Sequence, residues 1–480
     1  MTETAPAFTK SQIRRIMAGL MLALFLASLD QTIVATALSS IANDLGGWES
    51  LSWVVSAYLI ASTVTTPIYG RLSDLYGRRP VLLVAVVGFV IGALLCAAAT
   101  SMPELILARV VQGLGGGGLR SVSVAVVGDI FPPRERGRVQ GYLSSVFATA
   151  SVAGPVLGGL FSDYLSWHWI FLIDAPLGAG AFALTYFQLR RLPKPQRKPV
   201  IDWLGALFIL LSATPLLLGI TAAQRAGSFL APLPLFCFAL GLIFLAALVA
   251  TENAAAEPML PPRLFRTREF VLANAVTCTA SMANIGLVIH IPLAFQLMAG
   301  LSAKDAGLRM IAITIGSVSG SFVGGQLVSK LGRYRIMPVV GAALAATMSF
   351  TIAAVGLGHS LGFDLVSTLL LGLAFGASYA PMTVAVQNAL EPRDGGIGVA
   401  CMFFFRLLGG AFGVAALSAL LFNRLAATVP GALSGRALFD AAGPEALAGA
   451  FAAVFWAAGA VMLVNLLAAL TLRDLPLRGR

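Results

Sequence analysis

Charged residues are scarce in this sequence. Asp, Glu, Lys and Arg together make up 11% of its 480 residues, while 58% are hydrophobic. Soluble globular domains contain about 25% charged and about 45–50% apolar residues. A soluble protein of this composition would have a mostly apolar exterior, because it has too few charges to cover its surface. The composition therefore excludes an ordinary soluble protein and indicates that lipid surrounds most of the chain.

Cysteine and histidine are also rare, with four and three copies. The cysteines are far apart and each lies within an apolar run, so we expect buried thiols rather than a disulfide framework or a metal site. No cluster of metal ligands, no nucleophile paired with a base and no soluble catalytic domain is apparent. These absences favour a protein that is not an enzyme. The four cysteines are Cys96, Cys237, Cys278 and Cys401.

Long apolar runs are abundant, and fourteen of them have the length of about 20 residues that a spanning helix needs. The first run continues past Asp30 and is too long for the apolar region of a signal peptide, so it predicts a retained span. The runs are Ile16 to Leu38, Leu51 to Gly70, Val81 to Thr100, Leu105 to Val127, Val139 to Leu160, Trp169 to Leu189, Trp203 to Ala222, Leu230 to Ala250, Val271 to Phe295, Ala306 to Val328, Ile336 to Leu357, Leu361 to Val386, Ile397 to Leu421 and Leu447 to Leu472.

The positive charges alternate between the loops. If the amino terminus is inside, 24 of the 32 Lys and Arg residues fall in cytoplasmic segments, four in outer loops and four inside spans. Lys and Arg collect in cytoplasmic loops near span ends. This split predicts a multi-pass protein of the cell (inner) membrane with both termini in the cytoplasm. The formal net charge of +11 is then explained by topology, and we expect no nucleic-acid partner.

Proline and charge divide the chain into two six-helix blocks with two helices between them. We expect an amino-terminal bundle over residues 1–199, two inserted helices with linkers over 200–262, and a carboxy-terminal bundle over 263–480. The turn after the second span reads GRLSDLYGRR and the corresponding turn of the second block reads GQLVSKLGRYR. A weak repeat of this kind is typical of transporter halves related by an axis.

The segment GRLSDLYGRRP from Gly70 resembles the loop signature of the major facilitator superfamily. The glycines permit a tight turn, and Asp74 can meet a helix N-terminus or nearby arginines across the cytoplasmic gap. Such a contact would form in one transport state and break in the other. The alternative is a solvated, positively charged loop. The matching residues are Gly70, Asp74, Gly77, Arg78 and Arg79.

The first span, LASLDQTIVATALSSIANDLGG, resembles that of the drug:proton antiporters, especially the branch with fourteen helices. Asp30 lies deep in this span, and an ionisable group inside a membrane is usually functional. Counting along the helices places Arg109 of the fourth span at a similar depth, so the two side chains can face each other. The resemblance ties this arginine, in ARVVQGLGGGG, to proton transfer. We expect the pair to couple transport to protons; the alternative is a static ion pair.

The fifth span contains VAGPVLGG, which places small residues and a proline as in the antiporter motif of the same family. Small residues four positions apart let helices approach closely, and proline weakens the local hydrogen bonding. We expect an element that bends or seals between the halves, with a generic packing seam as the alternative. The four residues are Gly154, Pro155, Gly158 and Gly159.

Several polar residues depart from the family pattern. Arg120 follows Arg109 by eleven residues, which returns to within about 20° of the same helix face. A second buried cation favours an anionic ligand or a replaced partner of Asp30; the alternative is a side chain that extends toward the membrane surface. Asp174, near the outer end of the sixth span, is either hydrated or involved in proton transfer. Arg309 is expected to extend toward the outer surface.

The sequence therefore predicts an all-α polytopic membrane protein with the major facilitator fold and fourteen transmembrane helices. We expect a monomeric, proton-coupled antiporter that exports lipophilic, cationic drugs by alternating access, as in antibiotic resistance, with protons as coupling ion and no other cofactor. The alternatives are an exporter of an anionic metabolite, fatty acid or lipid, and a transporter-like sensor. His290, in the outer half of the ninth span, is either a cavity group or a hydrogen-bonded packing residue. The cavity candidates are Trp53, Tyr58, Arg120, His290, Tyr379, Met382, Gln387, Phe404 and Arg406.

Overall fold

The computed structural model describes residues 9–46, 51–191, 202–226, 228–255, 258, 260–301, 303–391, 394–428, 439 and 441–475. The described ranges form helices and contain no β-strand. The helices are α1 (Lys10–Leu45), α2 (Leu51–Tyr76), α3 (Arg78–Ala97), α4 (Met102–Ile130), α5 (Pro133–Tyr164), α6 (Trp169–Leu172), α7 (Asp174–Gln188), η2 (Leu189–Arg191), α8 (Trp203–Ala226), α9 (Pro232–Ala254), η3 (Pro262–Arg266), α10 (Arg268–Met298), α11 (Ala303–Leu331), α12 (Ile336–Val355), α13 (Leu361–Ala389), α14 (Gly395–Thr428) and α16 (Pro444–Thr471).

Local sequence signals set several helix boundaries. Thr9 caps α1 through its hydroxyl, and Gln12 returns a hydrogen bond to the Thr9 backbone, which satisfies donors that a helix start leaves open. Gly77 separates α2 from α3 with φ of +91°, a conformation that residues with a Cβ rarely adopt. This glycine therefore explains how two long helices can be joined by a single residue.

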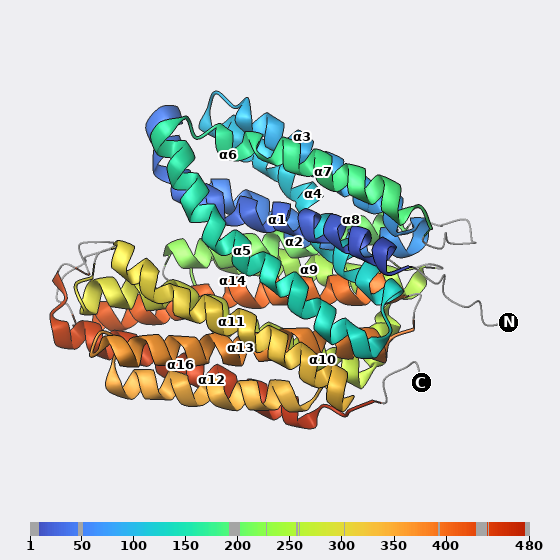
Figure 1. Ribbon diagram of the computed structural model, residues 1–480. Helices are drawn as coiled ribbons and strands as arrows, with labels where there is room; N and C mark the ends of the chain where they lie inside the picture. Colours follow the sequence, from blue (N-terminus) through green and yellow to red (C-terminus); the bar gives the residue numbers. More distant parts are fainter. Residues whose placement is uncertain are drawn as a thin grey trace.

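Twelve helices within the described ranges are long and apolar enough to cross a membrane. The remaining two of the fourteen predicted spans fall on α2 and α5, which have 26 and 32 residues and run through the same assembly (Figure 1). The predicted sixth span is divided, because α6 ends at Leu172 and α7 begins at Asp174. Pro176 has no N–H to bond back to Leu172, which accounts for a break at this point.

The long helices pack in two groups (Figure 1). In the first group α1 packs against α5 and α7, and α4 packs against α2 and α3. In the second group α11 packs against α13, α10 against α14, and α12 against α16. We call them the first and second halves. The start of α1 and the end of α16 lie at one end of the assembly, here named the terminal end.

Two helix pairs join the halves: α2 packs against α14, and α5 packs against α11. Gly70 allows the first approach, because a Cβ at this position would lie 2.9 Å from the carbonyl oxygen of Gly396. At the second pair the rings of Tyr142 and Phe322 lie 6.4 Å apart. Each pair joins the second spanning helix of one half to the fifth of the other, the relation that a repeated architecture produces.

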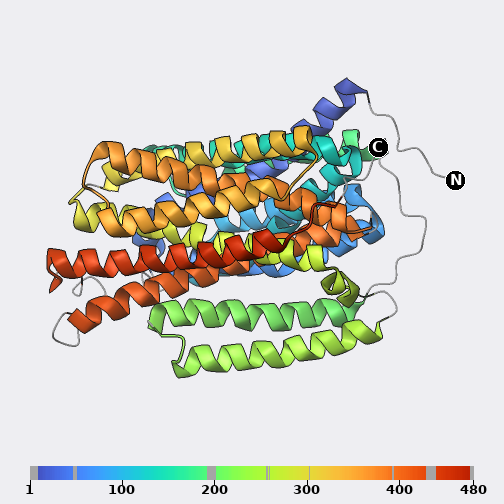
Figure 2. The same cartoon turned by 90° about the horizontal axis from the view of Figure 1, so that it is seen from below.

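Helices α8 and α9 pack against each other on one flank of the assembly (Figure 2). Only α8 makes extensive contact with the halves, and it touches both α2 and α14. Val64 of α2, Leu217 of α8 and Ala415 of α14 share one hydrophobic cluster. The inserted pair therefore lies beside a junction between the halves.

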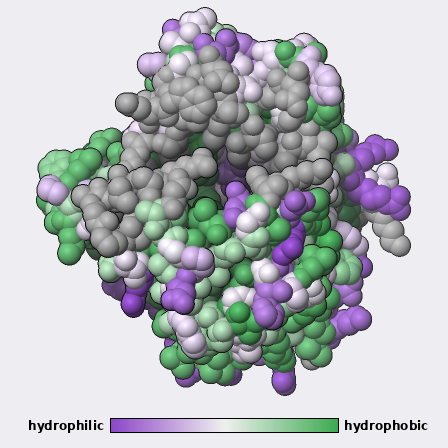
Figure 3. Space-filling view, turned by 90° about the vertical axis from the view of Figure 1, so that its left-hand side faces the viewer, coloured by the Kyte–Doolittle hydropathy of each residue, from purple (hydrophilic) through white to green (hydrophobic). Residues whose placement is uncertain are grey.

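The outward faces of the helices are apolar. Leu107, Leu242, Ile243 and Val464 are each more than half exposed, although all four are large hydrophobic residues. Figure 3 views the end opposite the terminal end and shows hydrophobic patches interspersed with hydrophilic side chains. Such a surface is stable only in contact with lipid, so the chain is a multi-pass membrane protein.

Candidate functional site

An ion pair between α1 and α4 lies in the interior of the first half. Arg109 Nη1 donates to both carboxylate oxygens of Asp30, at 2.8 and 2.9 Å. The exposed fractions of these side chains are 1% and 0%. Arg109 Nε also donates to the carbonyl of Val54 in α2 at 3.0 Å. The structure thus brings together the two residues whose depth along the helices indicated a contact.

Gln112 extends this pair to a second carboxylate. Its Nε2 donates to Asp30 Oδ1 at 2.9 Å and to Asp174 Oδ2 at 3.1 Å, and its Oε1 accepts from Arg109 Nη1 at 2.7 Å. Gln112 and Asp174 are both fully buried. We name Asp30, Arg109, Gln112 and Asp174 the Asp30 cluster. Burial contradicts the interpretation of Asp174 as a hydrated residue, because the start of α7 packs inside the half rather than at its surface.

Aromatic rings shield the Asp30 cluster. The Arg109 guanidinium carbon lies 4.4 Å from the centre of the Tyr58 ring and 5.8 Å from that of Phe171. Rings at these distances attract the cation and displace water from it. Tyr58 is therefore part of the packing around Arg109 and has an exposed fraction of 1%.

The glycine run of α4 makes this close packing possible. A Cβ at Gly113 would lie 2.6 Å from the carbonyl oxygen of Tyr58 in α2, and one at Gly115 would lie 2.6 Å from that of Ala85 in α3. Any larger residue would force the helices apart. The run therefore holds α2 and α3 against α4 and keeps Arg109 close to α2.

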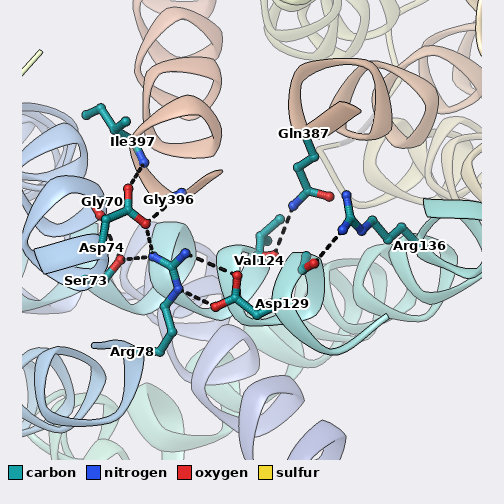
Figure 4. A network of polar contacts seen from close by, with 11 residues as sticks. Gly70, Ser73, Asp74, Arg78, Val124, Asp129, Arg136, Gln387, Gly396 and Ile397 are labelled. Atoms are coloured by element: carbon teal, nitrogen blue, oxygen red, sulfur yellow. Dashed lines mark hydrogen bonds and ion pairs between the residues drawn. The ribbon is translucent and has the colours of Figure 1, made fainter. Parts of the chain in front are cut away.

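A second polar network joins the halves at the terminal end (Figure 4). Asp74 accepts hydrogen bonds from the backbone N–H groups of Gly396 and Ile397, at 3.0 and 2.9 Å, and forms an ion pair with Arg78. Arg78 also pairs with Asp129 of α4 at 2.7 Å. The first turn of α14 thus supplies the helix N-terminus that the sequence predicted as a partner for Asp74. A carboxylate is well placed there, because helix N-termini carry unpaired donors and a partial positive charge.

Arg79 takes no part in this network. Its Nε donates to the carbonyl of Tyr186 in α7 at 3.1 Å, and its guanidinium lies 4.5 Å from the centre of the Tyr186 ring. It therefore fixes α7 to α3 within the first half.

The predicted antiporter motif lies in α5, opposite α1. A Cβ at Gly154 would lie 3.0 Å from the backbone nitrogen of Ile33 and closer still to the Thr32 side chain. One turn earlier, the Thr32 hydroxyl donates to the carbonyl of Ala150 at 2.9 Å. Gly158 is buried in the same helix. The burial of Pro155 and Gly159 lies outside what the structure describes. The motif thus joins α1 and α5, while the function we predicted for it is untested.

Three cavity candidates lie near each other between the halves. Arg120 is half-buried, donates to the carbonyl of Ala27 at 3.1 Å, and lies close enough to Arg406 of α14 for their charges to repel. Arg406 stacks over the Tyr379 ring at 4.0 Å. The Tyr379 hydroxyl accepts from Asn284 at 3.1 Å. Both Arg109 and Arg120 reach α1, as expected for residues on one face of α4, but Arg109 is buried rather than open to a cavity.

The other candidates have different surroundings. Met382 is buried in a hydrophobic cluster of the second half, and Gln387 donates across to the carbonyl of Val124 at 3.4 Å, beside the Asp74 network (Figure 4). His290 is 1% exposed, with Nδ1 2.8 Å from the Gly286 carbonyl and Nε2 3.3 Å from the Ser418 hydroxyl. These contacts favour packing over ligand binding for His290.

Phe404 packs on the hydrophobic cluster that α8 shares with α2 and α14, and Trp53 is half-buried in α2.

Arg309 differs from its predicted position at the outer surface. It pairs with the fully buried Asp364 of α13, and its guanidinium lies 5.3 Å from the centre of the Phe295 ring. Asp364 also accepts from the backbone N–H of Gly358 at 3.0 Å. Depth along α11 alone suggested solvent, whereas a carboxylate on a neighbouring helix holds the side chain inward.

Sequence reasoning missed three partners in these networks. Gln112 lies three residues after Arg109 in the motif ARVVQG, and this spacing would have placed both on one helix face. Asp129 and Gly396 carried no comparable signal, because their partners come from distant parts of the chain.

A lipid-embedded assembly of two helical halves, with a buried charge cluster in one half and a polar network joining the two, is characteristic of secondary transporters. The family model of the Major Facilitator Superfamily matches residues 20–414, and the chain belongs to this superfamily.

Curated relatives and solved structures agree with this assignment. An MFS-type transporter of Mycobacterium tuberculosis is 34% identical over 97% of this chain and 71% of its own length. Multidrug resistance protein 3 of Bacillus subtilis is 33% identical, with 83% of this chain and 78% of the relative covered. The crystal structure of human MFSD10, described as an organic anion transporter, aligns with a TM-score of 0.67 at 18% identity over 95% of this chain and 99% of its own, which shows a shared fold.

Proposed function

We propose that this protein is a proton-coupled multidrug efflux antiporter that exports lipophilic, cationic compounds by alternating access. The observation that carries the proposal is the fully buried Asp30–Arg109 pair, because an ionisable group inside a membrane is costly and usually functional. Two Bacillus subtilis relatives, named as a multidrug resistance protein and a multidrug transporter and each 33% identical to this chain, support export of drugs.

Protonation of Asp30 would be the coupling step. The neutral acid carries no charge to attract Arg109, so the guanidinium keeps only neutral hydrogen-bond acceptors, among them the Gln112 amide and the Val54 carbonyl. Loss of a buried charge pair changes the preferred packing of α1 against α4. In the proposed cycle a proton from outside binds Asp30, a drug leaves outward, and the proton is released inside.

We also propose the topology that this cycle needs. The terminal end lies on the cytoplasmic side of the inner membrane, as the distribution of Lys and Arg favours. The chain then has fourteen spans of the drug:proton antiporter branch, arranged as six-helix bundles over 1–199 and 263–480 with the inserted pair over 200–262. The protein acts as a monomer, with protons as its coupling ion and no other cofactor.

The test is transport by the full chain in liposomes with an imposed pH gradient. Ethidium, a lipophilic cation, is the probe, and a trapped pH dye reports proton movement. Asp30→Asn should abolish ethidium-dependent proton movement while the protein remains folded. Asp364→Asn, which changes another fully buried acid of an ion pair, should retain it. Unchanged proton movement in Asp30→Asn would overturn the proposal.

A second candidate function is export of an anionic metabolite, fatty acid or lipid. The specific observation is that Arg120 and Arg406 lie near each other, and neither forms an ion pair with a carboxylate among the described residues. Two neighbouring cations without an ion-pair partner attract an anionic ligand and repel a cationic one. Dodecanoate and ethidium transport should then respond in opposite directions to Arg120→Ala. Faster dodecanoate transport in this variant would refute the anion hypothesis.

A further inference from the structure

Asp174 is a second acid beside Asp30, and the mechanism proposed above does not use it. It is the first residue of α7 and has an exposed fraction of 0%. Gln112 Nε2 donates to its Oδ2, while Oδ1 has no hydrogen-bond partner among the described residues. The carboxyl group is thus fully buried with a single neutral donor.

The orientation of Gln112 follows from chemistry. Arg109 can only donate hydrogen bonds, so the atom of Gln112 that faces it must be the carbonyl oxygen. The Cys96 thiol donates to the same oxygen at 3.5 Å. The amide nitrogen therefore faces the two acids and gives one hydrogen to Asp30 and one to Asp174. The bridge links the acids without supplying a charge to either.

Positive charge is divided unequally between the two acids. Arg109 contacts both oxygens of Asp30, whereas Asp174 forms no ion pair among the described residues. Arg120 is half-buried and donates to the Ala27 carbonyl instead, and the other titratable groups nearby, Tyr58 and Cys96, carry no positive charge in either protonation state. The backbone amides at the start of α7 donate no hydrogen bond to Oδ1. An ionised carboxylate in such surroundings is costly, whereas a protonated acid is not.

We propose that Asp174 holds a proton while Asp30 is ionised, and that this proton is a second one exchanged in the transport cycle. The inference rests on the proposed proton coupling at Asp30. The O–H bond of Asp174 breaks when water reaches the site in the opposite conformation, the proton passes to that water, and the carboxylate is reprotonated from the other side. One additional proton then moves per cycle, with no other bond made or broken.

Infrared spectra of the full chain in lipid bilayers at neutral pH test the resting protonation state without any transport. A protonated acid has a C=O stretching band that an ionised carboxylate lacks. The wild-type spectrum minus that of Asp174→Asn should contain this band. The matched control is Asp364→Asn, which changes an equally buried acid that has a guanidinium partner, and its difference spectrum should contain carboxylate bands and lack the protonated-acid band. Carboxylate bands without the protonated-acid band in the Asp174→Asn difference would overturn the proposal.

The ethidium gradient at steady state tests whether the proton is exchanged. Each coupled proton multiplies the gradient about tenfold for each unit of imposed pH difference. Asp174→Asn should therefore reach a gradient about tenfold smaller per pH unit than the wild type. An equal gradient would show that the Asp174 proton is not exchanged. If the wild type moves no protons at all, the proposed function fails and exchange fails with it, whereas the infrared band still decides whether Asp174 is protonated.

Discussion

Asp74 of α2 accepts a hydrogen bond at 3.0 Å from the backbone N–H of Gly396, the second residue of α14. This contact joins residues 322 positions apart in the chain, one from each half. It can persist only while α2 and the start of α14 remain together. The bond therefore belongs to one conformation of the transporter, in which the terminal end is closed.

Asp74→Asn should open that end. The amide loses the charge that binds Arg78 and the α14 amides, and hydrogen bonds to a charged group contribute about 1.5–3 kcal/mol. We expect a roughly 10- to 100-fold shift toward separated halves. Spin labels at the exposed positions Arg138 and Leu331, on α5 and α11, would measure the distance. Asp129→Asn is the control, since Asp129 contacts Arg78 within the first half, and an equal shift there would contradict the explanation.

Gly70→Ala should shift the same equilibrium by a steric route. The added methyl group would lie 2.9 Å from the Gly396 carbonyl oxygen and closer still to Ala400. Overpacking of this kind costs about 1–3 kcal/mol, and here the cost arises only while the halves are in contact. The same pair of spin labels reports the change. Gly362→Ala places a methyl group in open space and should leave the distance unaltered.

Tyr58→Phe should preserve or increase stability. The Tyr58 hydroxyl is buried and has no hydrogen-bond partner among the described residues, whereas its ring faces the Arg109 guanidinium. A buried unsatisfied hydroxyl costs about 1–3 kcal/mol, and phenylalanine keeps the ring. Thermal unfolding in detergent is the measurement, with Tyr58→Ala as the variant that loses the ring as well. A marked loss of stability in Tyr58→Phe would mean that the hydroxyl has a partner.

Removal of Arg309 should destabilise the protein more than removal of the charge of Asp364. Asp364 is fully buried, whereas the Arg309 side chain is 18% exposed. Arg309→Ala leaves an uncompensated buried carboxylate, which costs about 3–5 kcal/mol. Asp364→Asn leaves a cation that can reach solvent, so the loss should be smaller. Unfolding temperatures of both variants and of the double variant would give the coupling, and equal losses would contradict the burial argument.

The sequence predicted those features that follow from the geometry of individual helices. Rise per residue gave the common depth of Asp30 and Arg109, and helical periodicity gave the shared face of Arg109 and Arg120. It was insufficient where the outcome depends on a neighbouring helix. Arg309 was expected to extend toward the outer surface, because its partner Asp364, 55 positions further along the chain, could not be deduced from the sequence. Asp174 was open to interpretation as a hydrated residue for the same reason, since only packing buries it.

Composition predicted the membrane environment, but the precise spans depend on local packing. The break between α6 and α7 follows from Pro176, whose effect on the helix was not considered when the span was predicted from the length of its apolar run. The long helices pack in two groups, and the pairing of α2 with α14 and of α5 with α11 did not follow from the apolar runs, because it depends on contacts between distant helices. The cavity candidates were chosen by depth along the helices, but their surroundings depend on the direction in which each side chain points. Arg120, Tyr379 and Arg406 lie near each other between the halves, whereas Tyr58 packs on Arg109.

The position of α8 has a mechanical consequence. Its hydrophobic cluster includes Val64 of one half and Ala415 of the other, so a single helix packs on two bodies that rotate relative to each other in the proposed alternating-access cycle. During that rotation α8 has to slide on at least one of them. On this flank α8 therefore packs across the junction between α2 and α14. On the other flank α5 and α11 contact each other directly, and neither inserted helix packs extensively on them among the described residues. In the proposed cycle the motion of the two halves is accordingly asymmetric, because the contacts of α8 resist it on one side only.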